Sequence, residues 1–225
     1  MQTMKLSKDT VNVLKNFNTI NPMIFFKTGN AITTISPGKT IFARYESPEN
    51  FESSFGIYKL DKLLSILSFF SDPELVISDK NLTIKEGKQK AKMAFANPIV
   101  LVYPEKDKVN MPSIDASFTL KEVDLNAITK AFSVMELPEV AFVSDGKKLS
   151  IKALDHKDPG GDSYTIEVSS EGEHDVSSEF TALFNINNLK MMPGDYNVKL
   201  TNKGIAEFSN DKLSYWIAVE KDSKF

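Results

Sequence analysis

The stretch PEVAFVSDGKKLSIKA (138–153) decides the fold, because it is one of four copies of a single pattern. Each copy has a proline, an apolar strand-like run, a short turn and a second strand-like run. The other copies continue after their prolines as MIFFKTGNAITTIS (23–36), ELVISDKNLTIKEG (74–87) and GDYNVKLTNKGIAEFS (194–209). Gly, Asn and Asp in the turns accept the positive φ that a tight hairpin requires. The sequence therefore predicts four repeated hairpins.

The four prolines, Pro22, Pro73, Pro138 and Pro193, each follow a segment with helical periodicity. Proline cannot continue a helix, so it suits a helix-to-strand junction. Ser7 is the expected N-cap of the first helix. The apolar stripes are Val11, Leu14 and Phe17 in the first segment, Leu60, Leu63, Leu64 and Leu67 in the second, and Leu125, Ile128, Phe132 and Met135 in the third. The fourth segment, Ile186 to Met192, is short and weak.

Further alternating stretches follow the hairpins, so the repeat is a βαβββ-like unit that occurs twice in each half of the chain. The predicted fold class is α+β, with antiparallel sheets backed by helices. The charged, proline-bearing stretch from Tyr103 to Ser117 lacks any pattern and separates the halves. We therefore predict two similar domains, residues 1–105 and 118–225, joined by a connector over residues 106–117.

Composition excludes several classes of protein. Of 225 residues, 41% are hydrophobic and 25% are charged, which is typical of a soluble protein with a packed core. The chain has no cysteine, so disulfides and thiolate chemistry are excluded. No apolar run approaches the length of a membrane span, and the N-terminus lacks the apolar stretch of a signal peptide. We expect a cytoplasmic protein whose 16 phenylalanines serve mainly as core.

Charge is distributed unevenly along the chain. The net charge is −3, yet the helix-like segments 5–18, 58–70, 119–135 and 185–192 together carry +4, which leaves −7 for the remainder. Solvated helix faces would explain any one of these segments. Lysines on several parallel helices can also follow a polyanion such as duplex DNA without reading its bases.

Catalytic motifs are missing from the sequence. It has no phosphate-binding loop, dinucleotide fingerprint or nucleophile elbow, and its two histidines, His156 and His174, lie in polar, loop-like stretches. We expect a protein that is not an enzyme and that has no cofactor or metal site. Two alternatives remain: a structural or adhesion β-rich protein without a DNA role, and a hydrolase built on paired acids such as Asp155 and Asp158.

Three stretches carry a resemblance to a known family. KLSKDTVNVLKNFNTIN (5–21), NLKMMPGDYNVKL (188–200) and YWIAVEKDSKF (215–225) resemble the DNA polymerase sliding clamps of T-even-type bacteriophages. The likeness covers essentially the whole chain after the three residues that precede Met4. It is strongest at the two ends and weakest between about residues 35 and 55.

The resemblance implies a homotrimeric ring of six domains around double-stranded DNA, with helices lining the hole and sheets outside. It implies a role without enzymatic activity in an infected bacterial cell, where the clamp tethers the replicative polymerase for processive synthesis. The implied partners are the polymerase's C-terminal peptide, an ATP-driven clamp loader and factors of late transcription. The missing phosphate loop agrees with opening by an external machine.

The resemblance also implies site residues. The family's DNA-facing helix positions fall on Lys8, Lys15, Lys59, Lys62, Lys121, Lys130 and Lys190, with Lys5 as an addition. The family's pocket for the polymerase peptide, near the interdomain connector, falls on Phe42, Met111, Pro112 and Ile114. Each of these four residues could instead belong to the core.

Overall fold

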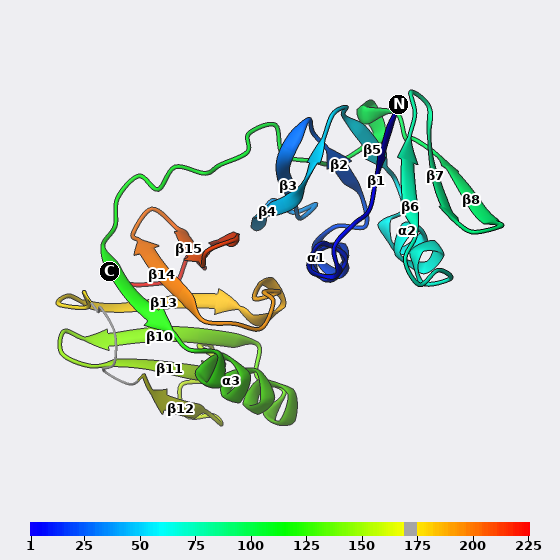
Figure 1. The fold of residues 1–225 in the computed structure, drawn as a ribbon. Coiled ribbons are helices and arrows are strands. Elements are labelled where there is room, and N and C mark those ends of the chain that lie inside the picture. The colour runs from blue at the N-terminus through cyan, green and yellow to red at the C-terminus, as the bar shows by residue number, and fades with distance from the viewer. Residues whose placement is uncertain (169–174) are drawn as a thin grey trace. The chain divides into compact units, whose positions relative to one another are not determined.

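The computed structural model describes residues 1–168 and 175–225 (Figure 1). The chain divides into two compact units, Met1–Lys108 and Val109–Phe225. Each unit has the same order of elements: one strand, a helix, four strands, a helix or helical turn, and three strands. Each unit is thus two βαβββ modules in succession, which confirms the predicted α+β class. No helix in the described ranges is long and apolar enough to cross a bilayer.

The first unit contains three groups of paired strands. Its elements are β1 (Gln2–Met4), α1 (Lys8–Ile20), β2 (Ile24–Phe26), β3 (Gly29–Ile35), β4 (Ile41–Phe51), β5 (Phe55–Ile57), α2 (Leu60–Leu67), β6 (Glu74–Ile77), β7 (Asn81–Glu86), β8 (Gln89–Ala94) and the 3₁₀ turn η1 (Pro98–Val100). One antiparallel sheet has the order β1-β6-β7-β8, while β3 pairs with β4 and β2 with β5. Helices α1 and α2 pack against each other (Figure 1).

The second unit contains two antiparallel groups of strands. Its elements are β9 (Ala116–Leu120), α3 (Glu122–Met135), β10 (Glu139–Asp145), β11 (Leu149–Leu154), β12 (Tyr164–Glu167), β13 (Glu179–Asn185), the 3₁₀ turn η2 (Ile186–Asn188), β14 (Tyr196–Thr201), β15 (Ile205–Ser209) and β16 (Leu213–Ala218). The strand orders are β12-β11-β10-β13 and β16-β15-β14-β9. Helix α3 packs on β11 and β12 (Figure 1).

Helix α1 follows from its sequence. Ser7 is the N-cap, because its hydroxyl accepts a hydrogen bond from the Thr10 amide at 3.2 Å. Leu14 and Phe17 of the predicted stripe are fully buried, and Val13 is buried beside them. Val11 was predicted to be buried with this stripe, but its side chain is only half-buried. Phe132 and Met135 of α3 are half-buried in the same way, while Leu125 and Ile128 are buried.

Two local predictions are wrong. In the first repeat, β2 does not form a hairpin with β3 but pairs with β5, because Phe26 stacks on Phe55 with ring centroids 4.7 Å apart. The segment predicted as the fourth helix forms only the 3₁₀ turn η2. Its two central asparagines are poor helix formers, and Pro193 leaves too little length for a stable α-helix.

Phenylalanines fill both cores, as predicted. In the second unit, Phe118, Phe142, Phe184 and Phe208 come from β9, β10, β13 and β15, with ring centroids 5.2–6.1 Å apart. All four are nearly inaccessible to solvent, so they join the two sheets of this unit. Burial of an aromatic ring contributes a few kcal/mol, and edge-to-face contacts add about 0.5–1.5 kcal/mol per pair. The phenylalanines of the strands therefore act in packing.

A carboxylate from β4 holds the start of α1. Glu49 accepts hydrogen bonds from the Thr10 hydroxyl at 2.6 Å, from the Ser47 hydroxyl and from the Ser7 amide. Partial burial opposes ionisation, but these hydrogen bonds more than offset it, so the pKa of Glu49 is lowered. A carboxyl with a lowered pKa in the folded state stabilises the fold above its unfolded pKa of about 4.3. That contribution is lost as the pH falls through the folded pKa.

We therefore expect Glu49→Gln to lower the free energy of unfolding by about 1–2 kcal/mol at pH 7, since hydrogen bonds to a charged acceptor are strong. The difference from the parent should shrink toward pH 3. Urea denaturation at both pH values and at fixed protein concentration measures it. Glu52→Gln, an exposed change three residues further on, serves as the control. An equal loss in both variants, or a loss independent of pH, would contradict the capping role.

Candidate nucleic-acid interface

The eight predicted DNA-facing lysines occupy three kinds of position. Lys8 and Lys15 lie in α1, Lys62 in α2 and Lys130 in α3. Lys59 and Lys121 are the N-cap residues of α2 and α3. Lys5 precedes α1, as the Ser7 N-cap implies. Lys190 follows η2, so the expectation that it lies on a helix is wrong. The fourth segment contributes no helix face, because only a 3₁₀ turn forms there.

Three lysines project from the helices away from the core. Lys15, Lys62 and Lys130 are exposed, whereas Leu14, Leu63 and Ile128 on the other faces of the same helices are buried. None of the three forms an ion pair with any residue among 1–168 and 175–225. Their ammonium groups are therefore available to an external anion.

A lysine also stands at the start of every α-helix. Lys8 is the first residue of α1, and Lys59 and Lys121 have no side-chain capping hydrogen bond. The N-terminal end of a helix dipole is positive, so a cation there disfavours the helix by about 0.3–1 kcal/mol. Helix stability does not explain these three positions. A cation at a helix N-terminus does favour a phosphate, which at α3 would compete with Asp195 for the Glu122 amide.

Lys5 and Lys121 form ion pairs with carboxylates in the part of the chain that the structure describes. Lys5 contacts Asp72, whose hydrogen bond raises the pKa of the Lys5 ammonium group. Lys121 lies 2.9 Å from Asp195. Asp195 also accepts a hydrogen bond from the Glu122 amide, and these two contacts lower its pKa. Phosphate binding at Lys5 or Lys121 would compete with these carboxylates, so both lysines are weaker candidates than Lys15, Lys62 and Lys130.

A groove of about 390 Å³ runs between α1 and α2 in the first unit. Its walls include Val11 of α1 and Leu64 and Leu67 of α2, and Lys8 and Lys15 lie along the α1 side. Asp72 also lines the groove. Cations beside an apolar depression can follow a backbone of phosphates without a specific base contact.

The predicted peptide-pocket residues belong to both units. Phe42 is buried in β4 of the first unit, at 7% exposure. Met111, Pro112 and Ile114 lie in the irregular chain of the second unit before β9, and Ile114 is 56% exposed. Phe42 thus has the burial of a core residue. The meeting of these four side chains in one pocket stays a prediction.

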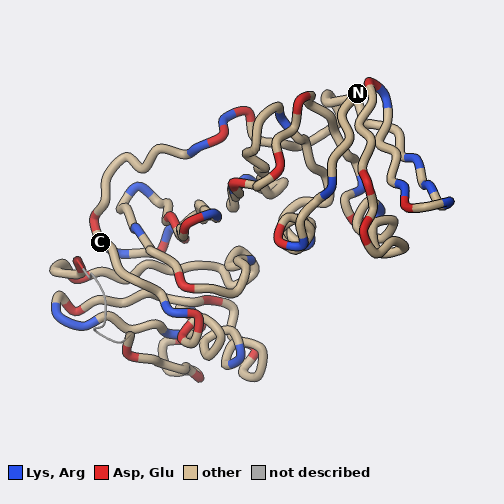
Figure 2. The backbone as a smooth tube through the Cα atoms, in the orientation of Figure 1, with Lys and Arg blue, Asp and Glu red and all other residues tan. Residues whose placement is uncertain are grey.

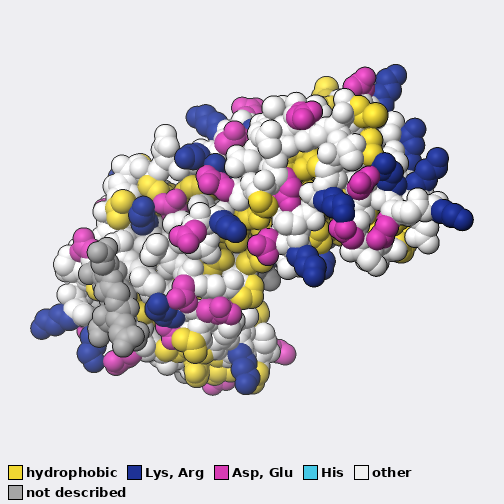
Figure 3. Space-filling view, viewed as in Figure 1, with side chains coloured by type: hydrophobic (Ala, Val, Ile, Leu, Met, Phe, Trp, Pro, Cys, Tyr) yellow, Lys and Arg dark blue, Asp and Glu magenta, His cyan; other side chains and the backbone are white. Residues whose placement is uncertain are grey.

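Sequence reasoning overlooked a cationic strand. Lys88, Lys90 and Lys92 are all exposed, on and just before β8 at the edge of its sheet. Figure 2 shows basic residues along the β7–β8 hairpin, and Figure 3 shows dark blue side chains grouped over it. Lysine at every second position of KQKAK (88–92) indicates a cationic strand face, because residues two apart share one face of a strand.

His156 follows β11, in the loop-like stretch that the sequence indicated. Its side chain is 24% exposed and lies between the Glu139 carboxylate of β10 and Asp222 near the C-terminus. The hydrogen bond with Glu139 raises the pKa of His156. His174 lies outside the described residues.

Comparison with solved structures defines the class of fold. The chain superposes on A. fulgidus PCNA, solved with the C-terminal region of FEN-1, with a TM-score of 0.75 at 18% identity over 100% of both chains. A PCNA2–PCNA3 complex from Sulfolobus tokodaii gives 0.74 at 16% identity, covering 97% of this chain and 99% of that one. The Helicobacter pylori beta clamp, bound to a DNA ligase peptide, gives 0.68 at 15% identity over 97% and 66%. The fold is therefore the sliding-clamp fold.

Comparison of sequences identifies the family. Residues 7–102 match the family of DNA polymerase processivity factors, and residues 117–221 match the C-terminal part of the gp45 sliding clamp. The sliding clamp of Vibrio phage KVP40 is 31% identical over 96% of this chain and 99% of its own. Those of Escherichia phage RB69 and Enterobacteria phage T4 are 28% and 29% identical over 98% of both chains. The chain belongs to the family of phage DNA polymerase sliding clamps.

Family membership confirms the predicted function as a sliding clamp for DNA polymerase in phage DNA replication. Clamps and processivity factors are accessory proteins rather than catalysts. The alternative of a structural or adhesion protein gains no support from these comparisons.

Proposed function

We propose that three copies of the chain form a closed ring around duplex DNA, with α1, α2 and α3 facing the DNA. The observation that carries this proposal is the exposed, unpaired state of Lys15, Lys62 and Lys130, one on each α-helix. The two predicted domains, residues 1–105 and 118–225, would supply six domains to the ring, with residues 106–117 as connector.

The ring holds DNA by enclosing it, and the lysines act as electrostatic guides. Phosphates repeat along the duplex, so an ammonium group that leaves one phosphate meets an equivalent one after a small movement. Contacts to base edges would differ from site to site and would hinder sliding. Loose contacts to phosphates thus combine retention on DNA with free movement along it.

The proposed partners are proteins that use the clamp as a mobile anchor. The C-terminal peptide of the replicative polymerase occupies a pocket formed by Phe42, Met111, Pro112 and Ile114. An ATP-driven loader opens the ring, because the clamp has no enzymatic activity of its own, and late-transcription factors also bind. The protein acts in the cytoplasm of the infected bacterium.

The free sheet edges suggest how the ring closes. Strand β8 ends one sheet and carries Lys90 and Lys92. Strand β12 ends another and carries Glu167, which lies 3.3 Å from Lys148, and Asp162 comes two residues before this strand. An edge strand presents unpaired backbone groups that can extend the sheet of another copy. Opposite charges on the two edges favour a contact between β8 of one subunit and β12 of the next. Such a head-to-tail contact produces a closed ring when the rotation is right.

We expect the double variant Lys90→Glu and Lys92→Glu to dissociate about tenfold more readily, since two lost ion pairs and the new repulsion amount to about 1.4 kcal/mol per contact. Light scattering over a dilution series measures this. The parent should show about 75 kDa for three 25.1 kDa subunits, and the variant should reach the monomer mass at higher concentration.

The complementary changes Asp162→Lys and Glu167→Lys in the same chain should restore the trimer, because each contact regains opposite charges. Lys106→Glu with Lys108→Glu, in the connector, is the matched control. A parent that stays monomeric would refute the ring, whereas a trimer indifferent to all of these changes would refute only the β8–β12 contact.

A further inference from the structure

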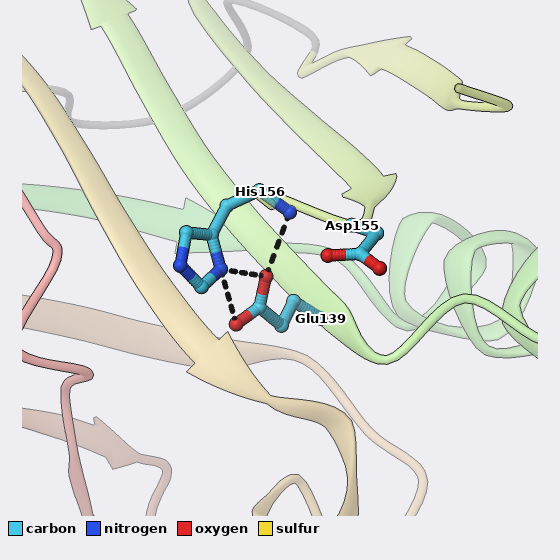
Figure 4. Close-up of side chains that lie close together, drawn as sticks. All are labelled: Glu139, Asp155 and His156. Atoms are coloured by element: carbon cyan, nitrogen blue, oxygen red, sulfur yellow. Dashed lines mark hydrogen bonds and ion pairs between the residues drawn. The ribbon is translucent and has the colours of Figure 1, made fainter. Parts of the chain in front are cut away.

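The Glu139 carboxylate contacts both the backbone amide and the imidazole ring of His156. The His156 amide donates a hydrogen bond to one Glu139 carboxylate oxygen at 3.0 Å. Nδ1 of the imidazole lies 2.8 and 2.6 Å from the two carboxylate oxygens (Figure 4). Glu139 is the first residue of β10 and has only 9% of its surface exposed. The imidazole is therefore fixed in place against a nearly buried carboxylate.

Asp155 adds a second carboxylate to the same place. One ligand atom from each of Glu139, Asp155 and His156 lies within 4.8 Å of the others, and all three residues are shielded in part from solvent. Figure 4 shows the Asp155 carboxylate beside that of Glu139. Two metal–ligand bonds of about 2.1 Å span about 4.2 Å. A small side-chain rotation would therefore bring one nitrogen and two oxygens into contact with a single ion.

The other ring nitrogen faces a third carboxylate. Nε2 of His156 lies 3.3 Å from Asp222. Without a metal, Nδ1–H donates a hydrogen bond to the Glu139 carboxylate. Zn²⁺ would replace that Nδ1 proton, while the N–H at Nε2 would continue to donate to Asp222. Histidines that bind metals usually donate their second N–H to a carboxylate in this way.

The site opens into a groove. A cavity of about 530 Å³ is lined by Asp155, His156 and Asp222 together with residues of β10, β11 and β13. Water molecules there could complete the coordination shell. The expectation of no metal site is the one this cluster challenges. Its residues do not form a local sequence motif, because Glu139 lies 17 residues before His156 and Asp222 lies far beyond it.

We propose that Glu139, Asp155 and His156 bind a Zn²⁺ ion, with Asp222 orienting the histidine. One imidazole with carboxylates is a donor set that suits Zn²⁺. The ion would fasten the C-terminal segment to the sheet, because Asp222 lies in a stretch whose backbone already pairs with β13. Thr181 and Lys224 exchange two hydrogen bonds there, of 2.8 and 2.9 Å. The site is separate from the DNA-facing lysines, and its test does not depend on processivity.

Competition between the full-length protein and a fluorescent Zn²⁺ chelator tests the site. The parent should bind one Zn²⁺ per chain. His156→Gln, Glu139→Gln and Asp155→Asn should each weaken binding at least about tenfold, and Asp222→Asn by about 10–100-fold. His174→Gln, at the chain's other histidine, and Asp162→Asn, in the same groove, are matched controls that should bind like the parent.

If the Glu139→Gln or His156→Gln variant fails to fold, Zn²⁺ binding by the Asp155→Asn variant tests the proposal. An asparagine oxygen can still accept the hydrogen bond from the Lys157 amide, so the loop stays intact in this variant. Circular dichroism verifies its fold. Co²⁺ in place of Zn²⁺ gives a second readout, a visible absorption band that Asp155→Asn should alter. A parent without stoichiometric Zn²⁺, binding that depends on His174, or full affinity in Asp155→Asn would each overturn the proposal.

Discussion

Replacement of Lys15, Lys62 and Lys130 together by glutamate is expected to reduce processive synthesis at least about tenfold at physiological salt. Each lysine is exposed and unpaired on its helix, so each substitution removes an attraction to phosphate and adds a repulsion. A phosphate contact contributes about one unit to the salt dependence of binding, and the proposed trimer would multiply the loss by three. Loading should suffer most, because DNA must enter the ring past these side chains.

Primer extension with polymerase and loader measures this effect as the length of product made in one binding event. The matched control changes Lys80, Lys147 and Lys203 to glutamate. These three exposed lysines lie in hairpin turns, so the control alters the net charge equally while sparing the helices. Urea denaturation should give the same stability for both triple variants. Equal processivity of the helix variant and the parent would refute the assignment of the DNA-facing side.

A clamp loaded on a closed circular duplex should be lost almost completely when a single cut makes the DNA linear. Phosphate contacts are interchangeable along the duplex, so they offer no barrier at a free end. A ring held only by enclosure therefore slides off. Labelled clamp that co-elutes with the plasmid before and after digestion measures the effect.

Biotin and streptavidin at both ends of the linear DNA form the control. Blocked ends should restore retention, because a bulky protein prevents the ring from passing. Persistent retention on linear DNA with open ends would show that direct affinity, rather than enclosure, holds the clamp. Loss from intact circles at the same rate would point to an open ring.

Local patterns predicted most of the fold, because they depend on neighbouring residues. Pro73 and Pro138 lie at helix-to-strand junctions, and Gly146 and Gly204 adopt positive φ in their turns, as the sequence indicated. These features report backbone preferences that act over a few residues. The βαβββ repeat could therefore be read without knowledge of tertiary contacts.

Strand partners could not be read in the same way. The strands β2 and β3 are adjacent in sequence, yet β2 pairs with β5 through the packing of Phe26, Phe51 and Phe55. The choice between two partners depends on which one buries more aromatic surface. That difference arises only when distant parts of the chain pack together.

The candidate DNA-facing lysines also have some properties that the sequence predicts and others that only the tertiary structure shows. Exposure of Lys15, Lys62 and Lys130 followed from helical periodicity, because a residue opposite an apolar stripe faces solvent. Helical periodicity could not predict that Lys5 pairs with Asp72 or that Lys121 pairs with Asp195, because each carboxylate comes from a distant segment of the chain. The sequence therefore indicated eight lysines, and the structure distinguished Lys15, Lys62 and Lys130 from the ion-paired Lys5 and Lys121.

By itself, the sequence determined the repeated module, the class of fold and the family, because periodicity, turn chemistry and characteristic stretches are all local properties of the chain. Tertiary structure alone decided which strands pair, which lysines remain free and which carboxylates surround His156. Those outcomes depend on long-range packing, which brings Glu139 to 2.6 Å from one ring nitrogen of His156 and Asp222 to 3.3 Å from the other.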